Sequence, residues 1–176
     1  MVGEHTGWKM TSFKLTEEQR KIIAPKLMDY FNGDNLVDAT EEQDKNGTDY
    51  YITNKSGLKI SVDVKWIKRT KKIRSEIPIL LELEHLYKGG KHKADGWSKL
   101  LNKNTNYICY YYSDLEYIIV LPFIELRNTT LRMESEYKIN YQLQYTNTNN
   151  NGNVVYFTSF ILVPYSVFIK DCFNLK

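Results

Sequence analysis

Hydrophobic and polar residues alternate along two neighbouring stretches, residues 49–54 and residues 58–66. Alternation of this kind is typical of β-strands, and both stretches are rich in residues that favour strands. Lys55, Ser56 and Gly57 lie between the two stretches and supply turn-forming residues. The pattern therefore predicts a β-hairpin over residues 49–66.

The register of this hairpin decides which side chains share a face. With the turn centred on the middle of the connecting residues, Tyr50 faces Val62 and Asp49 faces Asp63. Directly opposite residues point to the same side of a sheet, with Cβ atoms about 5 Å apart. We therefore expect one charged face with Asp49, Asp63 and Lys65, and one apolar face. The apolar face should consist of Tyr50, Ile52, Ile60, Val62, Val64 and Trp66.

Helical and strand patterns follow one another along the rest of the chain. Thr16 and Gln19 form a capping-box signature for a helix over residues 17–31, which Pro25 should kink or split. Residues 1–15 show no periodic pattern and are expected to be irregular. The order of the elements predicts a mixed α/β domain with a central sheet flanked by helices. Further strands are expected at 77–84, 107–112, 116–121, 141–145 and 154–163, and further helices after Pro122 and Pro164.

Two opposed acids on one face of a hairpin carry a chemical implication. Like charges directly opposite each other weaken a sheet, so Asp49 and Asp63 require a compensating group. A hard divalent cation such as Mg²⁺ takes oxygen ligands and is one such group. Lys65 lies on the same face and could orient or deprotonate a water molecule, or stabilise charge on a phosphate. The alternative is an exposed hairpin face with ordinary charged residues.

The spacing of these residues resembles a known signature. Asp49, a hairpin and then Asp63-Val64-Lys65 resemble the P-D…(D/E)-x-K motif of the restriction-endonuclease-like nuclease superfamily. The chain departs from this motif at Thr48, where the signature has proline, and 13 residues separate the two acids. The resemblance implies a restriction-endonuclease-like core within residues 16–176. It also implies a Mg²⁺- or Mn²⁺-dependent nuclease acting on DNA more readily than on RNA, with Asp49 and Asp63 as metal ligands and Lys65 as a catalytic residue.

Further acids could complete such a site. Members of the superfamily often place an extra acid upstream of the first strand, and Glu41, Glu42 and Asp44 are candidates here. Glu82 is another candidate, because it lies on a predicted strand. The alternatives are a solvated loop for at least two of the three upstream acids and an edge or half-exposed strand for Glu82. Because no single third acid stands out, a catalytically inactive binding protein of the same fold, such as a phage–host inhibitor or adaptor, remains the second hypothesis.

Positive charge is concentrated directly after the hairpin. Residues 65–103 carry a net charge of +7, whereas the other residues carry a net charge of −4. Clustered cations are the electrostatic feature of nucleic-acid binding. The alternatives are a solvated lysine-rich loop and, for the tryptophan, plain packing. The expected nucleic-acid contacts are Lys68, Arg69, Lys71, Lys72 and Lys91, with Trp97 as a base-stacking side chain.

Length and composition limit the remaining possibilities. The 176 residues fit one domain, with 42% hydrophobic and 26% charged residues, as in soluble globular proteins. No apolar run approaches the roughly 20 residues that span a bilayer, and the first ten residues lack a signal-peptide core. We therefore expect a cytoplasmic protein with no membrane partner. Cys109 and Cys172 are too few and too isolated for a disulfide framework or a zinc site, so we expect packed thiols.

Overall fold

The computed structural model describes residues 8–10, 15–45, 47–69, 76–87, 93–100, 104–150 and 153–175. The chain is mixed α/β, as predicted, and forms two compact units. The N-terminal unit comprises Val2–Arg74 and Asn102–Phe123, and the C-terminal unit comprises Ser75–Leu101 and Ile124–Lys176. Within the described residues, no helix is both long and apolar enough to cross a membrane.

The structure has two sheets where one central sheet was expected. Each unit has a sheet of its own, because strands that are distant in the sequence pair with each other. The chain leaves the N-terminal unit after the hairpin, returns to it for residues 102–123 and then leaves again. Local periodicity predicts individual strands, but it contains no information on which distant strand each one joins.

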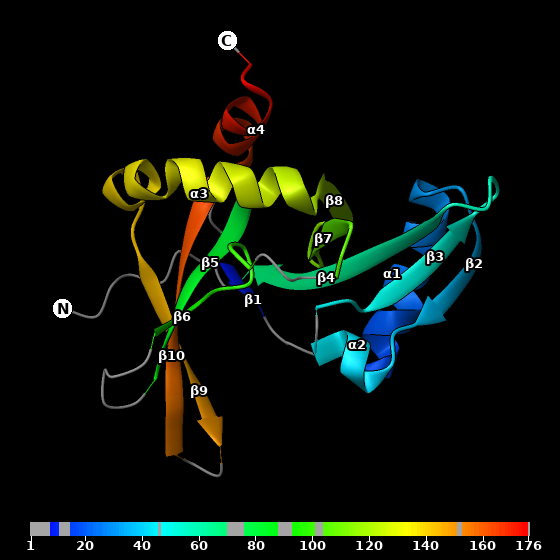
Figure 1. Cartoon of the computed structure of the whole chain (residues 1–176), viewed down its shortest axis with the longest axis horizontal. Coiled ribbons are helices and arrows are strands. Elements are labelled where there is room, and N and C mark those ends of the chain that lie inside the picture. Colours follow the sequence, from blue (N-terminus) through cyan, green and yellow to red (C-terminus); the bar gives the residue numbers. More distant parts are fainter. Residues whose placement is uncertain are drawn as a thin grey trace. The chain divides into compact units, whose positions relative to one another are not determined.

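The sheet of the N-terminal unit is mixed and has the strand order β2-β3-β4-β7-β8, with β1 paired to β4 (Figure 1). The β4 and β7 strands are parallel, and the other pairs are antiparallel. The strands are β1 (Trp8–Met10), β2 (Gly33–Asp38), β3 (Tyr50–Asn54), β4 (Lys59–Arg69), β7 (Tyr107–Tyr112) and β8 (Tyr117–Pro122). β1 shows that residues 1–15 are not wholly irregular.

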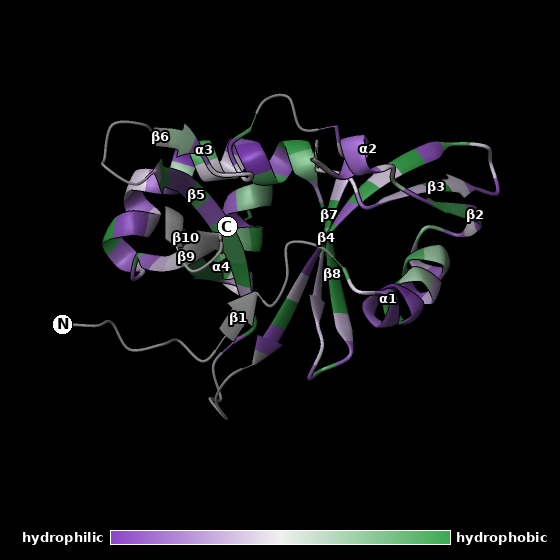
Figure 2. Ribbon diagram, turned by 90° about the horizontal axis from the view of Figure 1, so that it is seen from below, coloured by the Kyte–Doolittle hydropathy of each residue, from purple (hydrophilic) through white to green (hydrophobic). Residues whose placement is uncertain are grey.

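The β3–β4 hairpin has the predicted register, with Tyr50 opposite Val62 and Ile52 opposite Ile60. Its turn is held by Asn54, whose Oδ1 accepts hydrogen bonds from the Ser56 backbone N–H at 3.0 Å and its hydroxyl at 2.7 Å. The same oxygen accepts from the Leu58 N–H at 2.9 Å. Gly57 has a φ of +82°, a conformation that glycine adopts without steric cost. Figure 2 shows hydrophobic and hydrophilic positions alternating along the strands of this sheet.

The core of the N-terminal unit lies between the predicted apolar face of the hairpin and helix α1 (Glu17–Tyr30). All six residues of that face are buried in this core, together with Ile23 and Leu27 from α1. The predicted capping box is present, because Thr16 and Gln19 each accept a hydrogen bond from the backbone N–H of the other. Pro25 does not split the helix, which runs as one element to Tyr30.

Two elements between α1 and the hairpin were not predicted. Strand β2 forms the edge of the sheet, and helix α2 (Glu41–Lys45) replaces the expected acidic loop. Thr40 and Gln43 form a second capping box, with hydrogen bonds of 2.9 Å and 3.3 Å between side chain and backbone N–H. This signature has the same T-x-x-Q spacing as the one that begins α1, so the sequence did contain a signal for α2.

The C-terminal unit has an antiparallel sheet of order β6-β5-β10-β9 together with helices α3 and α4. Residues 146–150, which lie between the expected strands at 141–145 and 154–163, are also strand, because β9 continues through them as one side of a hairpin. The elements are β5 (Pro78–Tyr87), β6 (Lys93–Asp95), α3 (Phe123–Asn140), β9 (Gln144–Asn150), β10 (Asn153–Pro164) and α4 (Tyr165–Phe173).

Candidate active site on the β3–β4 hairpin

The paired register of the hairpin ends at Tyr50 opposite Val62, next to Asp49 and Asp63. Asp49 directly precedes β3, and its backbone N–H donates to the Val62 carbonyl at 2.9 Å. The charge of Asp63 acts on the Asp49 carboxyl and is one cause of the raised pKa of that group. The two acids therefore lie near enough for their charges to interact.

Both acids are buried, with only 4% of Asp49 and 4% of Asp63 exposed. Burial and the negative charge of Asp63 raise the pKa of Asp49 to about 7. A hydrogen bond of 2.7 Å from the Val64 N–H to Asp49 Oδ2 and the charge of Lys65 oppose this shift without cancelling it. The surroundings of Asp49 therefore disfavour its ionised form.

Lys65 supplies the positive charge of the site. Its Nζ lies 2.8 Å from Asp63 Oδ2, and the two side chains are only 12% and 6% exposed. An ordinary exposed hairpin face would leave these groups in water, so that alternative does not describe this face of the sheet. On the neighbouring strand β7, Ile108 and Tyr110 pair in register with Asp63 and Lys65 and are fully buried.

A polar segment at the start of β7 anchors the same end of the hairpin. Asn106 Oδ1 accepts hydrogen bonds from the Ser61 N–H at 2.8 Å and the Ser61 hydroxyl at 2.9 Å. The Thr48 hydroxyl, next to Asp49, donates to the Asn104 carbonyl at 2.6 Å. The hydrophobic periodicity of the sequence does not predict that these residues belong to the site. The available signal was the polar Asn104-Thr105-Asn106 stretch immediately before an apolar strand.

The upstream acids lie on helix α2. Glu41 and Glu42 are exposed and Asp44 is half-buried. The helix connects to the site through the backbone, because the Thr48 N–H donates to the Gln43 carbonyl at 3.1 Å. The structure therefore positions the segment that leads into Asp49. It does not identify which of the three carboxylates would be a third ligand.

Glu82 belongs to the C-terminal unit, whereas the two aspartates belong to the N-terminal unit. Only 2% of Glu82 is exposed, and β5 lies between β6 and β10, so the expectation of an edge or half-exposed strand is wrong. Its Oε1 accepts a hydrogen bond from the Trp97 N–H at 3.3 Å and lies 3.1 Å from His85 Nε2. Glu82 is thus held within its own unit.

The expectation that Trp97 stacks on bases is contradicted by its burial. Only 6% of Trp97 is exposed, which leaves its ring no face for a stacked base. The reason lies at Gly96, where a Cβ atom would stand 2.3 Å from the Glu82 carbonyl oxygen. Glycine lets the 93–100 segment approach β5 closely, and this approach buries the neighbouring indole. Packing is the correct interpretation.

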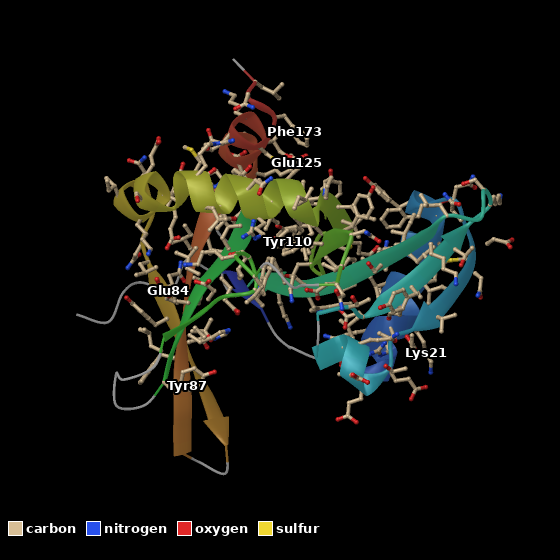
Figure 3. All side chains as sticks on the ribbon, in the orientation of Figure 1. Lys21, Glu84, Tyr87, Tyr110, Glu125 and Phe173 are labelled. Carbon is tan, nitrogen blue, oxygen red and sulfur yellow. The ribbon has the colours of Figure 1, made fainter. Side chains whose placement is uncertain are left out.

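A second buried cluster of charges lies in the C-terminal unit, and we call it the Lys99 network. Lys99 Nζ, on a side chain that is 7% exposed, lies 3.3 Å from Glu134, 3.4 Å from Asp95 and 3.8 Å from Glu84. Lys138 Nζ adds contacts of 2.6 Å to Glu134 and 3.8 Å to Glu84. Burial alone would raise the pKa of Glu134, but the hydrogen bond from Lys138 and the charge of Lys99 lower it overall. Figure 3 labels Glu84 on β5.

The predicted nucleic-acid contacts are only partly described by the structure. Lys68 is exposed near the end of β4, and Arg69 is the last residue of that strand, so both lie on a strand and not in the expected loop. Lys71, Lys72 and Lys91 lie outside the described residues.

The donors present around the hairpin are two carboxylates and one ammonium group. Among the described residues, no group of three or more His, Cys, Asp or Glu side chains is placed to hold a metal ion. A search of protein-family models, of curated proteins and of solved structures found no match to this chain. The chemistry of the site must therefore be argued from its own residues.

Proposed function

We propose that this protein is a metal-dependent nuclease that hydrolyses phosphodiester bonds, with DNA as the substrate. One observation carries the proposal: the hairpin buries Asp49 and Asp63 against each other beside Lys65. Burying like charges together costs free energy, and a bound cation would offset that cost. The resemblance to the P-D…(D/E)-x-K motif supports the same function, and with it a restriction-endonuclease-like fold.

The donor set fits Mg²⁺ or Mn²⁺. These hard cations prefer oxygen ligands, and one or two carboxylates commonly hold them while water and substrate phosphate complete the coordination. Asp49 and Asp63 would hold the ion in this site. When bound there, the ion would polarise the phosphate and lower the pKa of a water molecule.

The chain's own residues have distinct roles in this proposal. The Val64 N–H fixes the Asp49 carboxyl through the hydrogen bond to Oδ2, and Asp63 orients the Lys65 ammonium before substrate arrives. Lys65 would then position the attacking water and stabilise the charge that develops on the phosphate. Lys68 and the basic residues that follow it would contact the DNA backbone without reading its sequence.

A cleavage assay tests the proposal. Labelled duplex, single-stranded and branched DNA, and single-stranded RNA, are incubated with the protein in Mg²⁺, in Mn²⁺ and in EDTA. We expect cleavage of DNA in either metal and none in EDTA. Asp63→Asn and Lys65→Ala should each lose cleavage by roughly 10²- to 10³-fold, the usual loss when one group aimed at the reacting phosphate is removed. DNA binding should persist in Lys65→Ala.

Matched control variants distinguish a loss of activity that is specific to the site from a loss caused by misfolding. Asp34→Asn changes an exposed acid on β2, and Lys59→Ala changes an exposed lysine on β4, the strand that carries Lys65. Both controls should retain full activity. A folded wild-type protein that cleaves none of the substrates and takes up neither metal in calorimetry would refute the proposal.

One observation favours a second candidate function. The 2.8 Å ion pair with Lys65 already neutralises Asp63 without a metal. A catalytically inactive binding protein on the same fold, acting as an inhibitor or adaptor, could retain such a pair as a structural contact. This candidate predicts binding of DNA or of a protein partner with neither metal uptake nor cleavage, so the same calorimetry and cleavage experiments decide between the two functions.

A further inference from the structure

The β9–β10 hairpin lies within a segment of unusual composition. Residues 139–169 contain no Asp, Glu, Lys, Arg or His over 31 consecutive positions, although 26% of the whole chain is charged. At the average frequency, about eight charges would be expected in a segment of this length. The uncharged segment covers β9 and β10 completely.

β9 lies at the edge of its sheet, in the order β6-β5-β10-β9. An edge strand presents backbone N–H and C=O groups on its outer side, and proteins usually protect such edges with charges, proline, bulges or short length. β9 has seven residues, which correspond to about 23 Å of strand, and neither a charge nor a proline. Tyr145 on this strand is 57% exposed.

The other edge strands do carry these protective features. β6 is only three residues long and includes Lys93 and Asp95. β2 contains Asp34 and Asp38. β8 ends in a proline, Pro122. Among the described edges, β9 therefore differs in being long, uncharged and free of proline.

We propose that β9 is a self-association edge, through which two copies of this chain pair antiparallel about a two-fold axis. A two-fold interface brings each residue against its own counterpart or a near neighbour, so an uncharged segment avoids the repulsion that like charges would cause. The sequence of β9 is QYTNTNN. Its Gln, Thr and Asn side chains carry amide and hydroxyl groups that both donate and accept hydrogen bonds, and its exposed tyrosine would act as an aromatic anchor. Two four-stranded sheets would become one continuous sheet of eight strands. This inference is independent of the nuclease proposal.

Two measurements on the full chain test the proposal. Analytical ultracentrifugation from low to high micromolar concentration should show a monomer of 20.8 kDa converting to a species of twice that mass. Amide hydrogen exchange at the two ends of that range should show protection of residues 144–150 that increases with concentration, because paired N–H groups exchange slowly.

Tyr145→Lys places a charge on the edge, and Tyr117→Lys is the matched control on β8, where the tyrosine is 50% exposed. We expect Tyr145→Lys to weaken dimerisation by at least about tenfold, since like charges would then meet across the interface. Tyr117→Lys should leave dimerisation unchanged. A wild-type chain that stays monomeric throughout the range would overturn the proposal, as would a dimer with no added protection of β9. If Tyr145→Lys does not fold, the exchange experiment on the wild-type chain decides the question alone.

Discussion

The two buried charge clusters of this protein differ in how their acids are stabilised. In the Lys99 network, Glu84, Asp95 and Glu134 each lie within 4 Å of a lysine ammonium, and the pKa of Glu134 is lowered. On the hairpin, Asp49 lies against the carboxyl of Asp63, and its pKa is raised. In the Lys99 network, the protein's own lysines stabilise the ionised acids. On the hairpin, burial and the charge of Asp63 disfavour the ionised form of Asp49. This difference is the physical basis for proposing that the hairpin binds a ligand and that the Lys99 network has a structural role.

The largest expected effect is on catalysis, and it should separate the two clusters. Asp49→Asn should reduce metal-dependent cleavage by about 10³-fold, because the proposed metal ligand is lost while side-chain size is kept. Glu134→Gln, the matched change in the Lys99 network, should leave cleavage within about threefold of wild type, and any loss should track the folded fraction. Initial rates measured at equal concentrations of folded protein provide the comparison. Equal losses in both variants would show that the two clusters do not differ in the proposed way.

The next effect concerns stability. Lys99→Met removes the buried cation, but Lys138 still contacts Glu134 and Glu84, and Asp95 is 62% exposed, so we expect a loss of about 1–3 kcal/mol in the free energy of unfolding. Lys138→Met removes a lysine that is 34% exposed and should cost no more than about 1 kcal/mol. Urea denaturation of both variants measures the difference. A Lys99→Met protein as stable as wild type would mean that the network does not stabilise the fold.

The hairpin should show the opposite response to pH from an ordinary ion pair. Because the pKa of Asp49 is raised to about 7 in the folded protein, the folded state binds more protons than the unfolded state between pH 4 and 7. Its contribution to stability is therefore favourable at low pH and is lost as the pH rises through 7, by at most about 1.4 kcal/mol per pH unit. Metal-free unfolding measured from pH 5 to 8 should show this decline, and Asp49→Asn should reduce it. A decline of the same slope in the variant would assign the titration to another group.

The smallest expected effect concerns binding. Changing Lys68, Arg69, Lys71 and Lys72 together to alanine should weaken DNA affinity and reduce its salt dependence, because each phosphate contact contributes about 0.9 to the slope of log K against log salt. Fluorescence anisotropy over a range of salt concentrations gives the slope, and Lys59→Ala serves as the control. An unchanged slope would place the DNA-binding surface elsewhere.

The features that the sequence predicted correctly depend on residues that lie close together along the chain. The register of the hairpin follows from a short turn and from alternation over a few residues, so the pairing of Tyr50 with Val62 and of Ile52 with Ile60 could be predicted. The capping box at Thr16 predicted the start of α1, and the same reasoning applied to Thr40 would have predicted α2.

Contacts between distant segments could not be predicted in this way. β5 pairs with β10 across more than 60 residues, and the Lys99 network assembles side chains from β5, β6, the 97–99 turn and α3. The burial of Trp97 depends on the close approach of Gly96 to the backbone of Glu82, which no periodicity reveals. These features arise from the packing of elements and leave only weak local signals.

The Asn54 turn has a consequence for the order of folding events. A β-hairpin forms in about 1–10 µs, whereas the parallel pairing of β4 with β7 must close a loop of about 40 residues. Since three hydrogen bonds to Asn54 Oδ1 hold the turn, we expect the register to be selected before the distant strands pair. A slip of one residue would direct Asp63 into the apolar core. Asp63 thus disfavours the misregistered hairpin during folding, so the acid proposed to bind metal also helps to specify the pairing that positions it.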